Sequence, residues 1–221
     1  MEQQSQVDMV LEELLNEFDQ GLIEPGKRIK AAQISSRLGI SRGPVREALA
    51  ILSGRGLIEL KKDLGAVLKP MSVESLIKTW EIFEPILSYA IVTGTNNIGN
   101  RAEVLESIEQ AMERIERNAP VERGFQFYVL LTDYHWIIND LSGNEFVQDT
   151  VEKMNIMYWV RFLSNYINVD ETWPQYVKNY QRITDGILAG DGPGAAAAWS
   201  FHVRWSIGQM RLGVERQSGA C

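Results

Sequence analysis

The feature that most constrains this chain is a pair of short amphipathic helices predicted within residues 31–53. Apolar residues recur at helical spacing in both segments: Ile34 and Leu38 in the first, and Val45, Ala48, Leu49 and Leu52 in the second. Gly39 lies between them and can adopt the positive φ of a sharp turn, while Ser41 is a good N-cap. The segment therefore predicts a helix-turn-helix whose second helix covers residues 41–53.

The second helix carries two arginines on the side turned away from its apolar residues. Arg42 and Arg46 lie four positions apart, so they share one face. A helix that packs by one side and presents arginines near its N-terminus suits the major groove of DNA. The same pattern occurs in all-α proteins whose surface arginines are only solvated, so by itself it leaves both alternatives open.

A predicted hairpin follows this helix. Gly54 and Gly56 end the helix, and residues 57–60 and 66–68 read as two strands. The connection between them carries Lys61 and Lys62 and has Gly65 at its turn. A helix-turn-helix followed by a lysine-bearing hairpin is a winged helix, and this order favours DNA binding over the solvated-surface alternative.

The charge of the chain is unevenly distributed. The whole protein carries a net charge of −7, which by itself argues against a nucleic-acid partner. Residues 27–70, however, contain ten basic and only three acidic side chains. A basic segment within an acidic protein is the expected footprint of phosphate contacts.

The remainder of the chain carries helical signals and almost no strand signals. A helix at about residues 7–18 precedes the helix-turn-helix, which predicts a winged-helix domain over residues 1–71. Further helices are predicted at about 73–94, 101–118, 122–141, 145–166, 172–189 and 193–213. The sequence thus predicts a mainly α protein in which residues 72–221 form an all-α antiparallel helical bundle.

Composition limits the class of protein and the cellular compartment that we expect for this chain. The hydrophobic fraction is 45%, which is typical of globular proteins. The one cysteine, Cys221, allows no disulfide within the chain. No apolar run approaches the length of a membrane span, and the N-terminus lacks the pattern of a signal peptide. We expect a cytoplasmic protein.

Several motifs, taken in order, resemble a known family over nearly the whole chain. The chain resembles the winged helix of GntR-type bacterial transcription regulators at Glu24-Pro-Gly26, Leu38-Gly-Ile-Ser-Arg-Gly-Pro-Val-Arg-Glu-Ala-Leu49, Gly56-Leu-Ile58 and Gly65-Ala-Val67. It resembles the FadR branch, with its FCD-type ligand-binding domain, at Glu84-Pro85, Tyr134-His-Trp-Ile-Ile138, Leu141-Ser-Gly-Asn144, Ile187-Leu-Ala-Gly-Asp191 and His202.

The resemblance implies a homodimeric transcription regulator, with repression as the expected effect, controlled by a small-molecule effector in its helical domain. Two winged helices would bind a palindromic operator in double-stranded DNA. The expected DNA-binding residues are Ser41, Arg42, Gly43, Arg46, Lys61, Lys62 and Gly65. Two departures from the family pattern reduce the number of expected DNA contacts. Ala32 stands where the FadR protein has an arginine, and Leu64 stands where many relatives have a basic or histidine residue.

The helical domain departs further from the family pattern. Many FCD-type domains hold a divalent metal with one aspartate and three histidines. His135 and His202 match two of these histidines, but Leu131 stands at the aspartate position and Tyr180 at the remaining histidine position. Because zinc usually takes four ligands, we expect no metal cofactor; a bound metal would have to use His135 and His202.

The expected effector-binding residues are Trp80, Leu131, His135, Arg161, Tyr180 and His202. Trp80 stands where the family has an arginine that can hold an effector carboxylate. Arg161 is a candidate replacement anchor, although an ordinary surface arginine fits the pattern as well. The apolar replacements indicate a more apolar effector, such as an acyl or aromatic compound.

Other functions are compatible with parts of the pattern. One is a FadR-like acyl-ligand sensor that activates as well as represses transcription. Another is a helical scaffold that binds a protein and not DNA. A third is catalysis with His135 or His202 as general base near Asp133 or Asp185, but the chain has no nucleophile motif, phosphate loop or paired-carboxylate spacing to support it. We therefore expect that the protein is not an enzyme.

Overall fold

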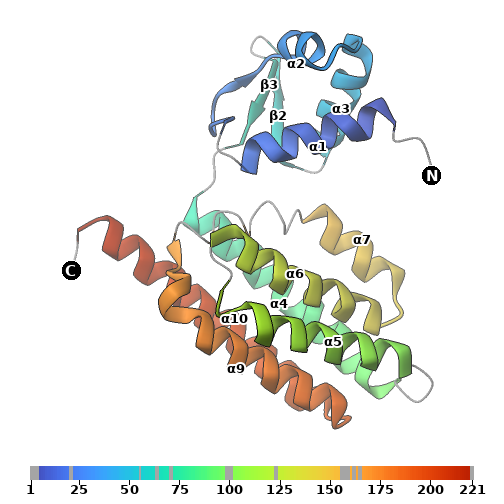
Figure 1. Cartoon of the computed structure of the whole chain (residues 1–221), viewed down its shortest axis with the longest axis vertical. Helices are drawn as coiled ribbons and strands as arrows, with labels where there is room; N and C mark the ends of the chain where they lie inside the picture. The colour runs from blue at the N-terminus through green and yellow to red at the C-terminus, as the bar shows by residue number, and fades with distance from the viewer. Residues whose placement is uncertain are drawn as a thin grey trace. The chain divides into compact units, whose positions relative to one another are not determined.

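The computed structural model divides into two compact units, one made mainly of residues 1–71 and the other mainly of residues from 72 onward (Figure 1). It describes residues 5–19, 22–54, 56–62, 65–69, 72–97, 102–121, 124–154, 160, 163 and 166–219. In these ranges, no helix is long and apolar enough to cross a membrane.

The first unit contains the predicted helix-turn-helix. Helix α3 (Arg42–Gly54) packs against both α1 (Gln6–Asp19) and α2 (Ala31–Leu38). Helix α2 ends at Gly39, whose φ of 66° lies in the left-handed region and whose N–H donates to the Ser35 carbonyl. The buried side of α3 consists of Val45, Ala48, Leu49 and Leu52, which are the residues whose spacing predicted this helix.

Three short strands complete the first unit. The wing consists of β2 (Ile58–Lys61) and β3 (Gly65–Leu68), which are antiparallel with Lys61 opposite Gly65. A third strand, β1 (Arg28–Ile29), pairs with β3 and makes the order β1-β3-β2. The predicted hairpin is therefore part of a three-stranded sheet. The sequence did not reveal β1 because two residues are too few to show an alternating pattern.

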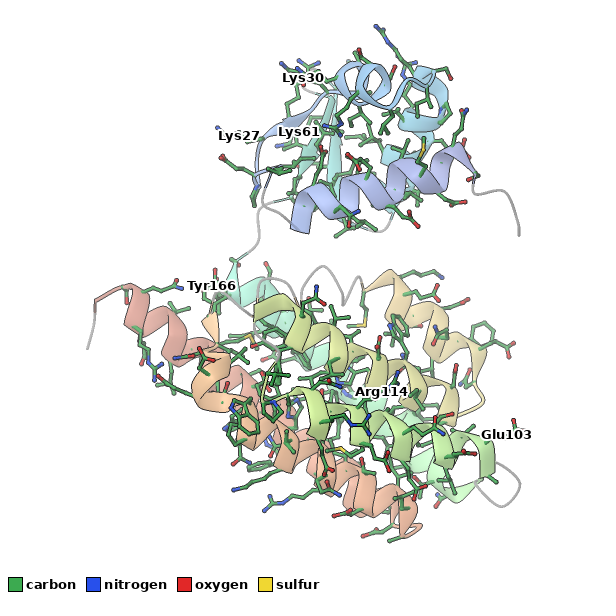
Figure 2. All side chains as sticks on the ribbon, in the orientation of Figure 1. Lys27, Lys30, Lys61, Glu103, Arg114 and Tyr166 are labelled. Carbon is green, nitrogen blue, oxygen red and sulfur yellow. The ribbon has the colours of Figure 1, made fainter. Side chains whose placement is uncertain are left out.

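The second unit is the predicted bundle of helices (Figures 1 and 2). It contains α4 (Val73–Asn96), α5 (Ala102–Asn118), α6 (Gly124–Leu141), α7 (Glu145–Lys153), α9 (Val169–Leu188) and α10 (Gly192–Gln217). Helix α10 packs against α4 and α9, and α6 packs against α4 and α5. The single helix predicted over 145–166 is wrong, since α7 ends at Lys153 and Met154 lies in a turn. No glycine or proline marks that turn.

Side-chain caps set where three helices of the bundle begin. Ser72 accepts a hydrogen bond from the Ser75 N–H at 3.1 Å and starts α4. The equivalent acceptors are Asn168 at α9 and Asp191 at α10. Each cap satisfies a backbone donor that the helix itself leaves unpaired. These caps fix where α4, α9 and α10 begin.

Candidate nucleic-acid interface and effector site

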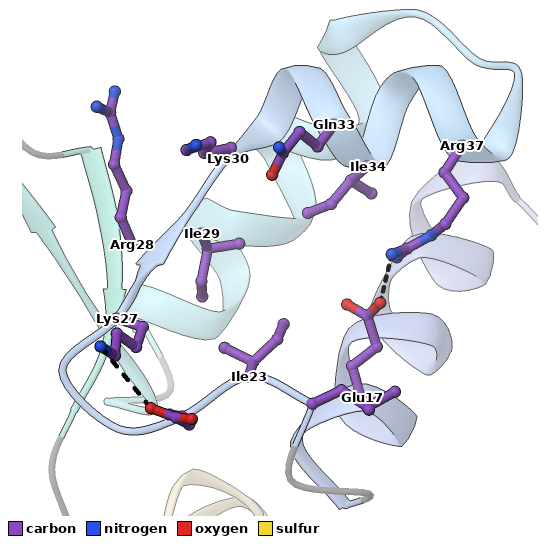
Figure 3. Close-up of a pocket in the computed structure, with 11 residues that line it drawn as sticks. Glu17, Ile23, Lys27, Arg28, Ile29, Lys30, Gln33, Ile34 and Arg37 are labelled. Atoms are coloured by element: carbon purple, nitrogen blue, oxygen red, sulfur yellow. Dashed lines mark ion pairs between the residues drawn. The ribbon is translucent and has the colours of Figure 1, made fainter.

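Some basic side chains of the first unit form ion pairs with acidic side chains. The pairs are Arg37 with Glu17 at 2.5 Å, Lys61 with Glu59 at 3.4 Å and Lys27 with Glu24 at 3.9 Å. Figure 3 shows the first and the last of these pairs. Lys61 was predicted as a DNA contact, and its partner on the same strand offsets part of its charge.

Arg42 and Arg46 are both exposed and unpaired. In the part of the chain that the structure describes, no acidic group lies within ion-pair distance of either guanidinium. Both residues line a groove that also includes Gly65 of the wing. An unpaired guanidinium offers a planar fork of donors that matches a guanine edge or a phosphate.

Of the other predicted DNA-binding residues, Gly65 lines this groove, and Ser41, Gly43 and Lys62 are exposed. Ser41 and Gly43 are exposed at the start of α3, and Lys62 is exposed directly after β2. Gly65 has a φ of 75°, a conformation that favours glycine at the turn of the wing. Leu64 lies outside the described residues. The groove also includes Arg28 and Lys30, which were counted in the charge of the segment and not assigned to the site.

In the second unit, four predicted effector residues lie in one buried aromatic cluster. Trp80, His135, Tyr180 and His202 come from α4, α6, α9 and α10 respectively. Ring centroids are 6.3 Å apart for Trp80 and His135, 5.7 Å for His135 and Tyr180, and 5.0 Å for Tyr180 and His202. Leu131 is buried one turn before His135 on α6. Arg161 lies outside the described residues.

Both histidines of the cluster are hydrogen-bonded on one ring nitrogen. The Tyr180 hydroxyl lies 2.6 Å from Nε2 of His135. The Asn179 side-chain amide donates to Nδ1 of His202 at 3.2 Å. Because an amide nitrogen can only donate, His202 is neutral and carries its proton on Nε2. Burial lowers the pKa of His202 to about 3, and burial together with the neighbouring His202 lowers the pKa of His135 to about 3.

This geometry does not support the catalytic alternative. Asp133 and Asp185 are exposed, whereas His135 and His202 are buried. The hydrogen bonds of the two rings go to Tyr180 and Asn179 and to no carboxylate. A histidine whose pKa is about 3 is also a weak base near neutral pH.

The donor set does not fit a divalent metal of the FCD type. Leu131 has no ligand atom, and the Tyr180 hydroxyl is hydrogen-bonded to His135. Across the described residues, no three His, Cys, Asp or Glu side chains gather in a way that could hold a metal ion. Two imidazoles leave a tetrahedral site half complete.

Comparisons with known proteins match both units. Residues 6–68 match the family described as bacterial regulatory proteins, gntR family, and residues 93–204 match the FCD domain. The probable D-xylose utilization operon transcriptional repressor of Paenarthrobacter nicotinovorans is 24% identical over 86% of this chain and 82% of its own length. The HTH-type transcriptional repressor RspR of Escherichia coli (strain K12) is 21% identical over 83% and 79%. The solved structure of E. coli McbR/YncC has a TM-score of 0.74 at 18% identity, over 95% of this chain and 99% of that chain.

Acidification should destabilise the second unit through its two buried histidines. Because their pKa values are about 3 in the folded protein and about 6.5 in an unfolded chain, the unfolded state binds more protons below pH 6.5. The free energy of unfolding should fall by about 1.6 kcal/mol per histidine in total between pH 6.5 and pH 5, an average of about 1.1 kcal/mol per pH unit. Urea denaturation at fixed protein concentration measures this fall.

The variant His202→Gln is the matched control for this pH dependence. It keeps an amide in place of the ring and removes one of the two titrating groups, so the slope should halve. An equal free energy of unfolding at pH 6.5 and pH 5 in the wild-type protein would contradict two buried neutral histidines.

Proposed function

Because the chain belongs to the gntR family of bacterial regulatory proteins and carries an FCD domain, we propose that it represses transcription as a homodimer on a palindromic operator. The family makes the protein a DNA-binding transcription regulator; repression, the dimer and the palindrome are our inference. The observation that supports the DNA-binding part of the proposal is the groove in which Arg42 and Arg46 are exposed and have no ion-pair partner among the described residues. The repressor acts in the cytoplasm, where bacterial promoters lie.

The proposed binding mode follows from the helix-turn-helix. Helix α3 enters the major groove by its exposed side, and the wing lies over the neighbouring backbone with Lys62. Arg42 and Arg46 contact base edges or phosphates near the start of α3. Two copies related by a twofold axis read two half-sites about one helical turn apart, so the operator is palindromic.

A small effector acts through the aromatic cluster of the second unit. Nδ1 of His135 and Nε2 of His202 are buried and have no hydrogen-bond partner among the described residues. A polar group of an effector would satisfy these atoms, while Trp80 and Leu131 favour an apolar body such as an acyl chain or an aromatic ring. The cluster rings contact one another, so an effector must displace some of them, and that repacking is the means by which it changes operator affinity.

The effector domain works without a metal in this proposal. Zinc, nickel and manganese should each be far below one ion per chain in protein purified without a histidine tag. The double variant Leu131→Asp with Tyr180→His restores the family's ligand types and should gain about one ion per chain; Tyr180→His alone is its control. A stoichiometric metal in the wild-type protein would refute metal independence, and the measurement on wild type stands even where the double variant folds poorly.

Substitution of Arg46 tests the DNA-binding proposal. Duplexes covering the DNA beside this protein's own gene provide operator candidates, which are assayed by gel shift at several salt concentrations. Arg46→Ala should weaken binding to the operator by about 1–3 kcal/mol, because it removes one arginine contact to a base or phosphate.

Arg204→Ala is the matched control, because Arg204 is an exposed arginine on α10 in the other unit. It should leave operator affinity unchanged. Equal affinity of Arg46→Ala and wild type would rule out α3 as the recognition helix. A wild-type protein that shifts no duplex in a salt-dependent manner would refute the proposed function.

A further inference from the structure

We propose that Arg28 and Lys30, on and directly after strand β1, bind DNA phosphates and form a second cationic border of the DNA-binding groove. The inference rests on the proposed function, because it assumes that the first unit binds duplex DNA. It adds two residues outside the helix-turn-helix and the wing hairpin, and it assigns them a positioning role in DNA binding.

The alternation of a strand places these two side chains on the outer side of β1. Ile29 lies between them and is buried, with 5% of its surface exposed. Because successive side chains of a strand point to opposite faces, Arg28 and Lys30 share the exposed face. Figure 3 shows Arg28 extending to the opposite side of the strand from Ile29.

The groove joins these residues to the recognition helix. Arg28, Lys30, Arg42 and Arg46 all line it. Arg28 also lies beside the turn of the wing, since its Nε would be 3.7 Å from a Cβ placed on Gly65. Basic side chains from α3 and from the β1 segment therefore both line the groove.

Among the described residues of the unit, no acidic side chain pairs with this charge. Within the described ranges, no acidic group lies within ion-pair distance of any of these four residues. The neighbouring Lys27 and Arg37, by contrast, are paired with Glu24 and Glu17. Four unpaired cations around one groove repel one another, and a polyanion relieves that repulsion.

The start of α2 adds to the same potential. Helix α2 contributes Ala31 and Ala32 to the groove and no charged side chain. Lys30 occupies its N-cap and makes no side-chain cap hydrogen bond. The positive end of the helix dipole therefore faces a groove whose described lining residues include no carboxylate, a setting in which phosphate binds well.

The position of Arg28 and Lys30 indicates that they contact DNA phosphates and not bases. They lie on a strand and a helix cap at the border of the groove, while α3 carries the side chains that enter the major groove. Phosphate contacts fix the register of the protein on the duplex and carry no sequence information directly. Losing one should weaken all duplexes alike and lower the slope of log K against log salt concentration by about 1.

The test compares three single variants with the wild type on two duplexes. Fluorescence anisotropy measures the affinity of wild type, Arg28→Ala, Lys30→Ala and Lys27→Ala for the operator and for a scrambled duplex at several salt concentrations. Arg28→Ala and Lys30→Ala should weaken binding to both duplexes by roughly 3- to 10-fold, with the salt slope lower by about 1. Lys27→Ala removes the same charge next to β1 but outside the groove, and it should change affinity less than about twofold.

A charge-preserving variant separates a phosphate contact from a structural role. Arg28→Lys should keep the wild-type salt slope, and circular dichroism checks that each variant is folded. The inference fails if Arg28→Ala and Lys30→Ala behave like Lys27→Ala, or if they weaken only operator binding with an unchanged salt slope. A wild-type protein without salt-dependent DNA binding would instead refute the proposed function.

Discussion

The burial of one side of α3 determines what the first unit can do. Val45, Leu49 and Leu52 are packed inside the unit, so the opposite side of the helix, with Arg42 and Arg46, faces solvent. Ion pairs neutralise basic side chains elsewhere, between α2 and α1 and along the wing. Four basic side chains without an ion-pair partner among the described residues, Arg28, Lys30, Arg42 and Arg46, therefore line one groove of a protein whose net charge is −7. In the proposed binding mode, this distribution steers DNA to that groove and away from the acidic remainder of the surface.

The elements with strong periodicity were predictable from the sequence, and short or non-local features were not. Helix α3 shows four apolar residues at helical spacing, and the wing shows two strands around a glycine. Strand β1 has only two residues and was not predicted. Arg28 and Lys30 therefore contributed to the predicted charge of the segment, but the sequence did not indicate where their side chains lie. The ion pair of Lys61 with Glu59 could have been predicted from the sequence, because residues two positions apart share one face of a strand.

In the second unit, helix and turn signals indicated where most helices lie, but not which side chains of different helices meet. The contact of Tyr180 with His135 joins residues 45 positions apart, and only the arrangement of the helices in the bundle brings the two side chains together. The same holds for Asn179 and His202. These two hydrogen bonds and the surrounding rings hold both imidazoles in a buried, neutral state. The family motifs identified the two histidines as site residues, but they did not indicate these hydrogen bonds or the surrounding rings.

Lysine acetylation with and without operator DNA, followed by mass spectrometry, tests most directly that the groove of the first unit is the DNA-binding face. Lys30 lines the groove, Lys27 is paired with Glu24, and Lys78 and Lys178 are exposed on the second unit. We predict that the operator slows acetylation of Lys30 and leaves the rates at Lys27, Lys78 and Lys178 unchanged. An unchanged rate at Lys30, together with protection of Lys78 or Lys178, would contradict the assignment of the groove.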